Sequence, residues 1–330
     1  MITSVKLKIH RIVHLSFCGL IASSLCFALF ADEPESNLKK ILNRFEVLPE
    51  YYFEQDARFY TNYKNEEFKE AFLVSGNTEF EAMFVSYHDN VLDVLFGAYY
   101  RNYIGMGRQN ASILFSPRDT YYTLRPFFEL RHKFNNKLLF YQTGLDHTCF
   151  HQVDRKERET PYWNEIYLQV SSDNYRPQLQ RKYLVEDDRW DFFDRFRWSF
   201  RMGYFIREFG NVDKSIINGF HPFSSNFSIE TGYSFFKSNS WILGAHHNFA
   251  LFSDTTGASY WSGALELSAD IYNRKHTLGF FINYNYEPGR GMPMYDSSQF
   301  PKSDNYQGEK KMMPLFSRDR LVEFGIRWRY

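Results

Sequence analysis

The chain has 330 residues, with 39 basic (Lys and Arg) and 39 acidic (Asp and Glu) side chains. Residues 1–31 contain three bases and no acid, so their removal leaves 36 bases against 39 acids. This balance excludes a typical nucleic-acid-binding protein, which carries a basic excess. Aromatic residues make up 20% of the chain although its mean hydropathy is negative. This composition excludes disorder, a coiled coil and a helical membrane bundle. It favours a sheet with one face in lipid and the other in water.

The N-terminus has the features of a secretory signal. A basic n-region is formed by Lys6, Lys8 and Arg11. The apolar stretch 12–30 follows, and Ala31 precedes an acidic segment, so we predict a signal peptide over 1–31 that is cleaved after Ala31. An uncleaved anchor is the alternative, because the apolar stretch is about long enough to span a bilayer. Residues 32–50 are predicted to form a periplasmic segment with a short helix.

From residue 51 onward the dominant pattern alternates with period two, which is typical of β-strands. In residues 196–207 one face is apolar and aromatic, whereas the interleaved positions carry arginines. Aromatic residues alternate with charged or small polar ones in the same way near 120–131, 227–235, 261–271 and 322–330. A soluble sandwich would not place aromatic residues on one face and arginines and acids on the other in strand after strand. This pattern indicates a transmembrane barrel with lipid outside and a polar lumen inside.

Thirteen segments have strand character. They lie near 52–62, 67–75, 78–88, 91–103, 119–134, 137–149, 162–173, 193–208, 226–237, 240–252, 260–272, 276–287 and 319–330. Single-chain bacterial barrels have an even strand number, so we predict one antiparallel barrel of about 12 strands over 51–330, within a range of roughly 10–14. The last strand ends on Tyr330, which looks like the terminal aromatic that the outer-membrane assembly machinery reads. The expected location is the bacterial outer membrane.

Arginine recurs at the positions that would face the barrel interior. The predicted lumen arginines are Arg125, Arg131, Arg195, Arg197, Arg201 and Arg207. Two functions remain open for such a lumen: ion pairs that fill a structural barrel, or a narrow channel that attracts anions. A barrel of roughly 8–12 strands is usually filled by its own side chains, which weakens the channel hypothesis.

The only cysteine of the exported chain lies in a segment with chemical potential. His147 and Cys149 are two residues apart and therefore share one face of a strand. Asn164 shares its face with the apolar, lipid-facing residues of the next strand. If the two strands pair, these three side chains meet on the outer wall. The amide would then orient the imidazole, the imidazole would take the thiol proton, and the thiolate would attack an ester carbonyl.

This segment resembles outer-membrane phospholipase A, a family of 12-stranded barrels with a lipid-facing His-x-Ser motif and a following Trp-Asn on the adjacent strand. The resemblance implies that His147 is the general base, that Cys149 stands at the serine nucleophile and that Asn164, after Trp163, is the orienting amide. It also implies an ester hydrolase that acts on membrane lipid as a calcium-bound homodimer. This chain departs from the pattern by its cysteine and by the longer spacing between His147 and Asn164.

The segment also resembles a family of uncharacterised bacterial envelope proteins with a His-x-Ser-x-His-x-Gly-Asp signature. The matching positions are His147, Cys149, His151 and Asp154, and Val153 replaces the glycine. For the calcium ion that the phospholipase resemblance implies, the nearest oxygen ligands are Asp154 and Thr160. We expect phospholipid or lipopolysaccharide and the assembly machinery as partners, and no nucleic acid.

Ordinary packing is the alternative explanation of the same residues. A histidine near the membrane interface is common in barrels, and Cys149 would then pack against lipid or form an intermolecular disulfide. Metal binding by His147 with His151 is a third hypothesis. His246 and His247 lie on opposite faces of one strand, so they cannot hold one ion together there.

Overall fold

The computed structural model describes residues 44–61, 74–107, 116–134, 137–152, 162–172, 175, 190–206, 223–238, 240–254, 257, 259–273, 276–287 and 321–330. Within these ranges the first six strands are β1 (Phe45–Thr61), β2 (Val74–His88), β3 (Leu92–Gly107), β4 (Ser116–Phe134), β5 (Lys137–Gln152) and β6 (Tyr162–Ser172). The other six are β7 (Phe196–Phe205), β8 (Phe223–Lys237), β9 (Trp241–Asp254), β10 (Ser259–Asn273), β11 (His276–Glu287) and β12 (Leu321–Arg329). Helix α5 (Phe192–Arg195) directly precedes β7. No helix in the described part of the chain is long and apolar enough to cross a membrane.

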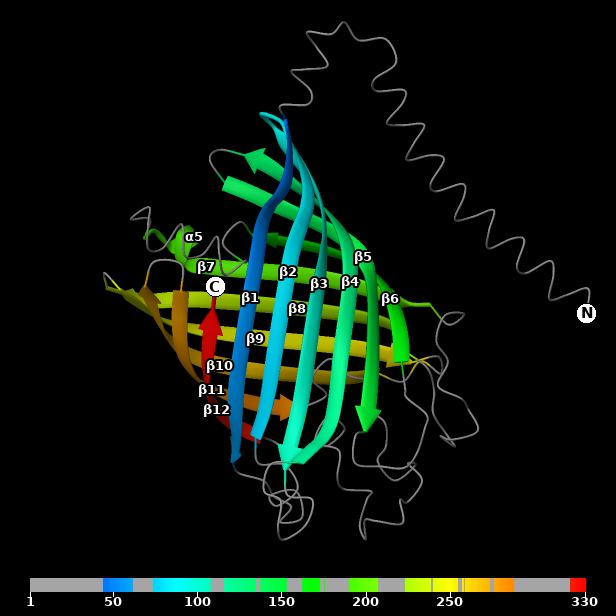
Figure 1. Cartoon of the computed structure of the whole chain (residues 1–330), viewed down its shortest axis with the longest axis vertical. Helices are drawn as coiled ribbons and strands as arrows, with labels where there is room; N and C mark the ends of the chain where they lie inside the picture. Colours follow the sequence, from blue (N-terminus) through cyan, green and yellow to red (C-terminus); the bar gives the residue numbers. More distant parts are fainter. Residues whose placement is uncertain are drawn as a thin grey trace, which may run out of the picture. The chain divides into compact units, whose positions relative to one another are not determined.

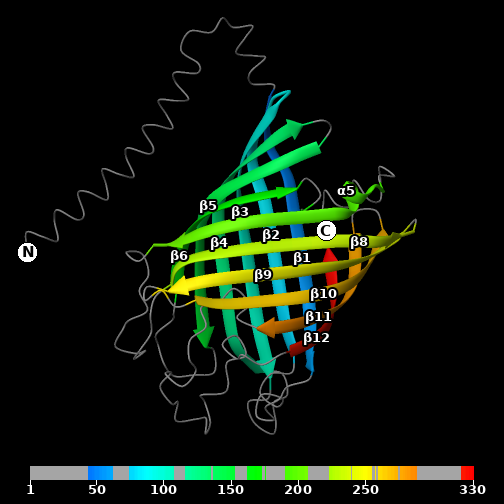
Figure 2. The ribbon, with the colours of Figure 1, turned by 180° about the vertical axis from the view of Figure 1, so that it is seen from behind.

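The strands form one closed antiparallel barrel (Figures 1 and 2). Each strand pairs with its neighbours in the sequence, and β1 pairs with β12 from Glu54↔Arg329 to Thr61↔Val322. Closure is required in lipid, because an open sheet would leave the N–H and C=O groups of its edge strands without hydrogen bonds. The predicted all-β antiparallel barrel and the strand number of 12 are confirmed.

The predicted strand boundaries near the N-terminal end of the barrel are wrong. Residues 78–88 do not begin a new strand, because Val74–His88 is continuous. Asn77, between the two predicted segments, is a buried inward residue of this strand that pairs with Tyr103 and accepts a hydrogen bond from Arg101. Strand β1 begins at Phe45, so the predicted helix cannot include the last part of 32–50. Residues 1–43 and 62–73, including the predicted signal peptide, lie outside the described residues.

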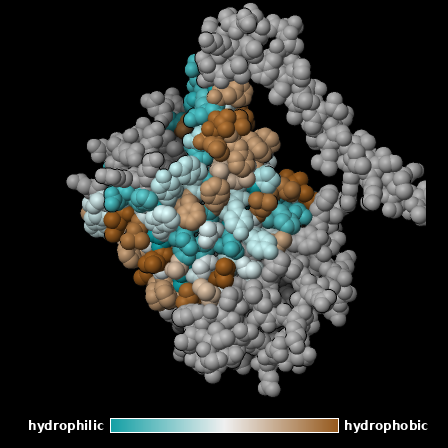
Figure 3. Space-filling view, in the orientation of Figure 1, coloured by the Kyte–Doolittle hydropathy of each residue, from teal (hydrophilic) through white to brown (hydrophobic). Residues whose placement is uncertain are grey.

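Side chains alternate between an exposed apolar exterior and a buried polar interior. On β6, the outward Ile166 is 51% exposed, whereas the inward Glu165 is 5% exposed. On β12, Phe324, Ile326 and Trp328 face outward, and Glu323 and Arg327 are buried. Figure 3 shows one face, where hydrophobic residues gather in patches among hydrophilic ones over the described strands. Strand after strand of exposed apolar side chains fits a surface that contacts lipid.

Part of the interior is packed by large side chains over glycines. Phe127 on β4 is 1% exposed and contacts Met83 and Leu95. Its register partners are Gly97 on β3 and Gly144 on β5. A Cβ atom on either glycine would lie 2.9 Å from an atom of the Phe127 side chain, so a larger residue at either position would force Phe127 to move. This packing joins β3, β4 and β5 next to the segment of β5 that carries the candidate site.

Candidate active site

The candidate residues lie on two paired strands, β5 and β6. In the antiparallel register His147 is directly opposite Asn164, and Cys149 is opposite Tyr162. Leu145 and Ile166 are the next outward pair, and both are exposed. Because outward residues alternate with inward ones, His147, Cys149 and Asn164 all project from the outer wall. The longer spacing between His147 and Asn164 is taken up by the connection at 153–161, so it does not change the register.

The three side chains form a continuous hydrogen-bonded chain. Asn164 Oδ1 lies 2.8 Å from His147 Nδ1, and His147 Nε2 lies 2.9 Å from Cys149 Sγ. An amide oxygen can only accept, so it favours the tautomer in which Nδ1 carries the proton and Nε2 is free to accept one. Asn164 is only 8% exposed, whereas His147 and Cys149 are half-buried. The arrangement therefore has a shielded orienting group and an accessible nucleophile.

The surroundings of the triad (His147, Cys149 and Asn164) are apolar and aromatic. Leu124 and Tyr122 on β4 are the register partners of His147 and Cys149. Cys149 is a free cysteine three residues before the end of β5, which places it about 10 Å along the strand from the barrel rim.

The inner side of the same wall is strongly charged. Asp146 and Glu165, the neighbours of His147 and Asn164 in the sequence, form a register pair that faces the lumen. Arg201 on β7 donates through Nη2 to both carboxylates, and its distance to Glu165 Oε2 is 2.9 Å. Arg125 on β4 makes a two-pronged contact with Asp146, with 2.9 Å between Nη2 and Oδ2. Both acids behind the triad, Asp146 and Glu165, are thus paired on the inner side of the wall.

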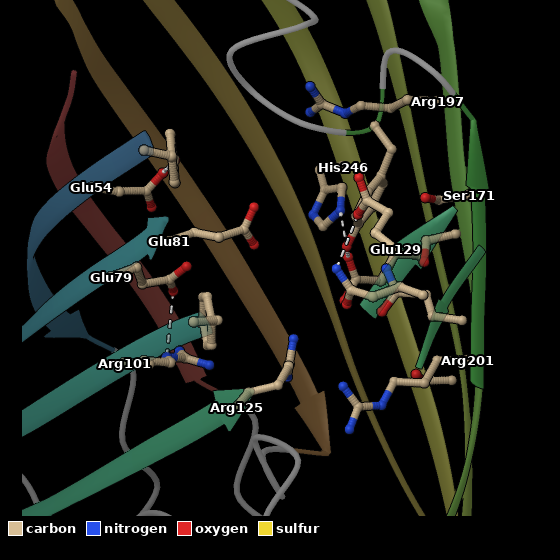
Figure 4. A pocket seen from close by; sticks show the side chains of 18 of the residues that line it. Glu54, Glu79, Glu81, Arg101, Arg125, Glu129, Ser171, Arg197, Arg201 and His246 are labelled. Carbon is tan, nitrogen blue, oxygen red and sulfur yellow. Dashed lines mark hydrogen bonds and ion pairs between the residues drawn. The ribbon is translucent and has the colours of Figure 1, made fainter. Parts of the chain in front are cut away.

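The barrel interior contains a cavity of about 360 Å³. Among the described residues six arginines and six glutamates line it, so its charge is balanced. Figure 4 shows Arg125 and Arg201 extending into this cavity from different strands, and the ion pair of Arg101 with Glu79 at 3.4 Å. Tyr175 also lines the cavity and donates a hydrogen bond to Glu230. The polar side chains of the cavity wall thus form ion pairs and hydrogen bonds with one another.

The predicted lumen arginines occupy different positions in the structure. Arg125, Arg197 and Arg201 line the cavity. Arg131 faces inward on β4, where it binds Glu129 and Glu50 at 2.8 and 2.6 Å. Arg195 ends helix α5, ahead of the strand alternation that starts at Phe196, and it is not among the described residues that line the cavity. Arg195 instead lies 5.3 Å from the ring centroid of Trp190 and 5.2 Å from that of Tyr233.

The remaining predicted site residues, which are ligands and one lumen arginine, fall largely outside the described residues. Asp154, Thr160 and Arg207 are among them, and of His151 only the backbone is described. Within the described part of the chain, no group of three His, Cys, Asp or Glu side chains could hold a metal ion. His246 lines the cavity, and its Nε2 lies 3.8 Å from Glu230, whereas the adjacent His247 pairs with the outward Leu265.

No protein-family model and no curated protein sequence matches this chain. Among solved structures, outer membrane phospholipase A from Escherichia coli is similar at 13% identity and a TM-score of 0.47, over 88% of this chain and 96% of that chain. The calcium-bound outer membrane phospholipase dimer from Salmonella typhi is similar at 14% identity and a TM-score of 0.45, over 84% and 89%. An outer membrane channel from Pseudomonas putida F1 is similar at 9% identity and a TM-score of 0.45, over 86% and 95%. Similarity this low concerns architecture only.

The chain folds as a bacterial outer-membrane β-barrel. This conclusion stands on its own topology, since a closed antiparallel barrel with an apolar exterior is the β-structure that satisfies every backbone group in lipid.

A Ser-His-Asp arrangement, separate from the triad, lies near the turn between β2 and β3. Ser86 Oγ is 2.7 Å from His88 Nε2, and His88 Nδ1 is 3.2 Å from Asp93 Oδ1. However, Ser86 is 0% exposed, and Lys133 binds Asp93 at 2.6 Å. No substrate can reach a fully buried hydroxyl, so these contacts stabilise the turn between β2 and β3.

Sequence reasoning missed the charged residues behind the triad. Asp146 and Glu165 were visible as acids next to His147 and Asn164, and the alternation alone would have turned them inward. Their common partner Arg201 was found only as one member of the lumen arginines. Its reach from β7 across β6 to β5 depends on side-chain geometry, which alternation does not contain.

Proposed function

We propose that this protein is an acyl hydrolase of the outer membrane that cleaves ester bonds of membrane lipids at a His147-Cys149-Asn164 triad. The observation that carries the proposal is the pair of contacts at His147, 2.8 Å to Asn164 Oδ1 and 2.9 Å to Cys149 Sγ, on the outer wall. The order of the three groups, with an amide that orients the imidazole and a thiol at the other ring nitrogen, is the order that a base-activated nucleophile needs.

The first half of the proposed reaction transfers the acyl group to the protein. His147 Nε2 takes the thiol proton while Asn164 holds Nδ1–H, and Cys149 Sγ attacks the ester carbonyl carbon. The new bond joins sulfur to the carbonyl carbon. The bond between that carbon and the alcohol oxygen breaks as His147 returns the proton to the leaving alcohol, which is the lysolipid.

The second half regenerates the thiol. His147 removes a proton from water, and the hydroxide attacks the thioester carbon. The sulfur–carbon bond breaks, the fatty acid leaves, and His147 returns the proton to Cys149. The lipid-facing position of the triad supports this substrate class, because acyl chains lie against Leu145, Ile166 and Leu124 without leaving the membrane.

The lumen supports the barrel rather than conducting ions under this proposal. An arginine-rich lumen would attract anions only if its cations were unpaired. The arginines that line the cavity are balanced by glutamates, and contacts such as Arg327 to Glu266 at 2.5 Å hold them. The narrow channel therefore remains the second candidate, with the charged cavity as its only support.

Calcium and a homodimer enter only as implications of the phospholipase resemblance. Asp154 and Thr160 would contribute oxygen ligands to calcium. A second copy would pack against the apolar outer wall. Both are tested by measuring activity with and without calcium and by cross-linking the protein in micelles.

The central experiment measures fatty acid release from mixed phospholipid–detergent micelles by refolded protein in the presence of calcium. Wild type and Cys149→Ala are compared, with Thr143→Ala as the matched control on the same strand and face. Release by wild type and Thr143→Ala that disappears in Cys149→Ala supports the proposal. Equal background release by all three proteins refutes it.

A further inference from the structure

Two adjacent residue pairs of the β5–β6 ladder face opposite sides of the barrel wall. The side chains of the pair His147↔Asn164 face outward, and those of the adjacent pair Asp146↔Glu165 face the lumen. Any change in the spacing or register of the inner pair therefore moves the outer pair as well. The 2.8 Å contact between His147 and Asn164 lies in the same stretch of the ladder as the two inner carboxylates.

Alone, these carboxylates would repel each other. Asp146 and Glu165 are each 5% exposed, and like charges directly opposite on adjacent strands destabilise the pairing. Arg201 removes this repulsion, because its Nη2 donates to Asp146 Oδ2 and to Glu165 Oε2. Its guanidinium carbon also lies 3.8 Å from the ring centroid of Tyr167, which fixes the side chain over β6.

The neighbouring residues are arranged around this contact. The side chain of Glu165 passes over Gly203 on β7, where a Cβ atom would lie 1.5 Å from Glu165 Oε1 and 2.4 Å from its Cδ. Asn226 on β8 donates to the same oxygen at 2.8 Å. Arg125 holds Asp146 from the other side. The four strands β5 to β8 thus fix the position of Glu165 relative to Asp146.

We propose that Arg201 is a positioning residue, which acts through the barrel wall: by bridging Asp146 and Glu165 inside, it sets the strand spacing that aligns His147 with Asn164 outside. This inference rests on the proposed hydrolase function. Arg201 touches neither the triad nor the lipid, so it acts on catalysis only through the geometry of β5 and β6.

The experiment combines two readouts in refolded, detergent-solubilised protein. The first is kcat and KM for fatty acid release. The second is the pH profile of Cys149 alkylation by iodoacetamide, which requires no turnover. The variants are Arg201→Gln and Gly203→Ala, which displaces Glu165 but changes no charge. Arg327→Gln is the matched control, since Arg327 is also buried in the lumen and stacks at 4.5 Å over Phe281, on strands remote from the triad.

Arg201→Gln and Gly203→Ala should each lower kcat about tenfold or more at nearly unchanged KM and should displace the alkylation profile along the pH axis. Arg327→Gln should behave as wild type in both readouts. Adding Glu165→Gln to Arg201→Gln should restore both readouts, because the repulsion disappears with the second carboxylate.

An Arg201→Gln protein that folds and matches Arg327→Gln in both readouts overturns the proposal, and so does a double variant without rescue. If Arg201→Gln does not fold, Gly203→Ala decides between the same two outcomes. If wild type releases no fatty acid, the proposed function fails. The alkylation profile then still decides whether Arg201 positions the triad.

Discussion

Replacing Asn164 by alanine tests whether the triad is a working unit. The change removes the oxygen that lies 2.8 Å from His147 Nδ1 and leaves a ring N–H without its partner on a wall that faces lipid. It alters neither the nucleophile nor the base. It removes only the group that orients the imidazole.

The magnitude follows from the burial of the bond. Asn164 is 8% exposed, so water cannot replace its oxygen without entering the wall. Leaving a buried polar group unsatisfied costs about 1–3 kcal/mol. If this cost appears in the transition state, where the imidazole becomes charged, kcat falls about 10- to 100-fold with KM nearly unchanged.

The assay is fatty acid release from mixed micelles over a range of lipid concentrations. Thr143→Ala is the matched control, because Thr143 lies on the outer face of β5 and donates to Tyr167 O on β6 at 2.8 Å without touching the triad. It should retain wild-type kcat. Heat-modifiable migration on gels checks that each variant folds. A folded Asn164→Ala protein with wild-type kcat would show that Asn164 does not orient His147. The proposed catalytic triad would then be refuted.

Four further predictions concern the nucleophile, the interior, the exterior and ion conduction. Cys149→Ser should retain fatty acid release, because a hydroxyl can accept the same activation by the imidazole; complete loss in a folded protein would mean that the site needs a thiol. Phe127→Ala should lower the free energy of unfolding in urea by about 3–5 kcal/mol, since Phe127 is 1% exposed among three strands, and a cost below about 1 kcal/mol would contradict the packing. Leu267→Arg, at an outward position near the middle of β10, should destabilise the barrel in liposomes by about 2–4 kcal/mol, and an unchanged stability would mean that this face does not contact lipid. Wild type in planar bilayers should give no ion steps, and regular steps would favour the channel.

The class of the fold could be predicted because alternation is a local property. Residues 196–206 place apolar and polar side chains on opposite faces regardless of what the strand pairs with, and the same holds for 322–330. The predictions that differ from the structure concern where elements begin and end. Helix α5, capped by Asp191, holds Arg195 ahead of the alternating segment, and Val74–His88 is one continuous strand where two segments were predicted.

The candidate site depends on contacts between strands that residue spacing along one strand does not predict. The sequence alone determined that His147 and Cys149 share a face and that Asn164 lies on an apolar face of the following strand, since both follow from counting residues along a strand. Only the tertiary structure decided that His147 is directly opposite Asn164, because the register of two strands is set by all their contacts together and by the length of the connection between them. It also decided that Arg201, from a third strand, joins the acids behind them, because a side chain that crosses two strands leaves no period in the sequence.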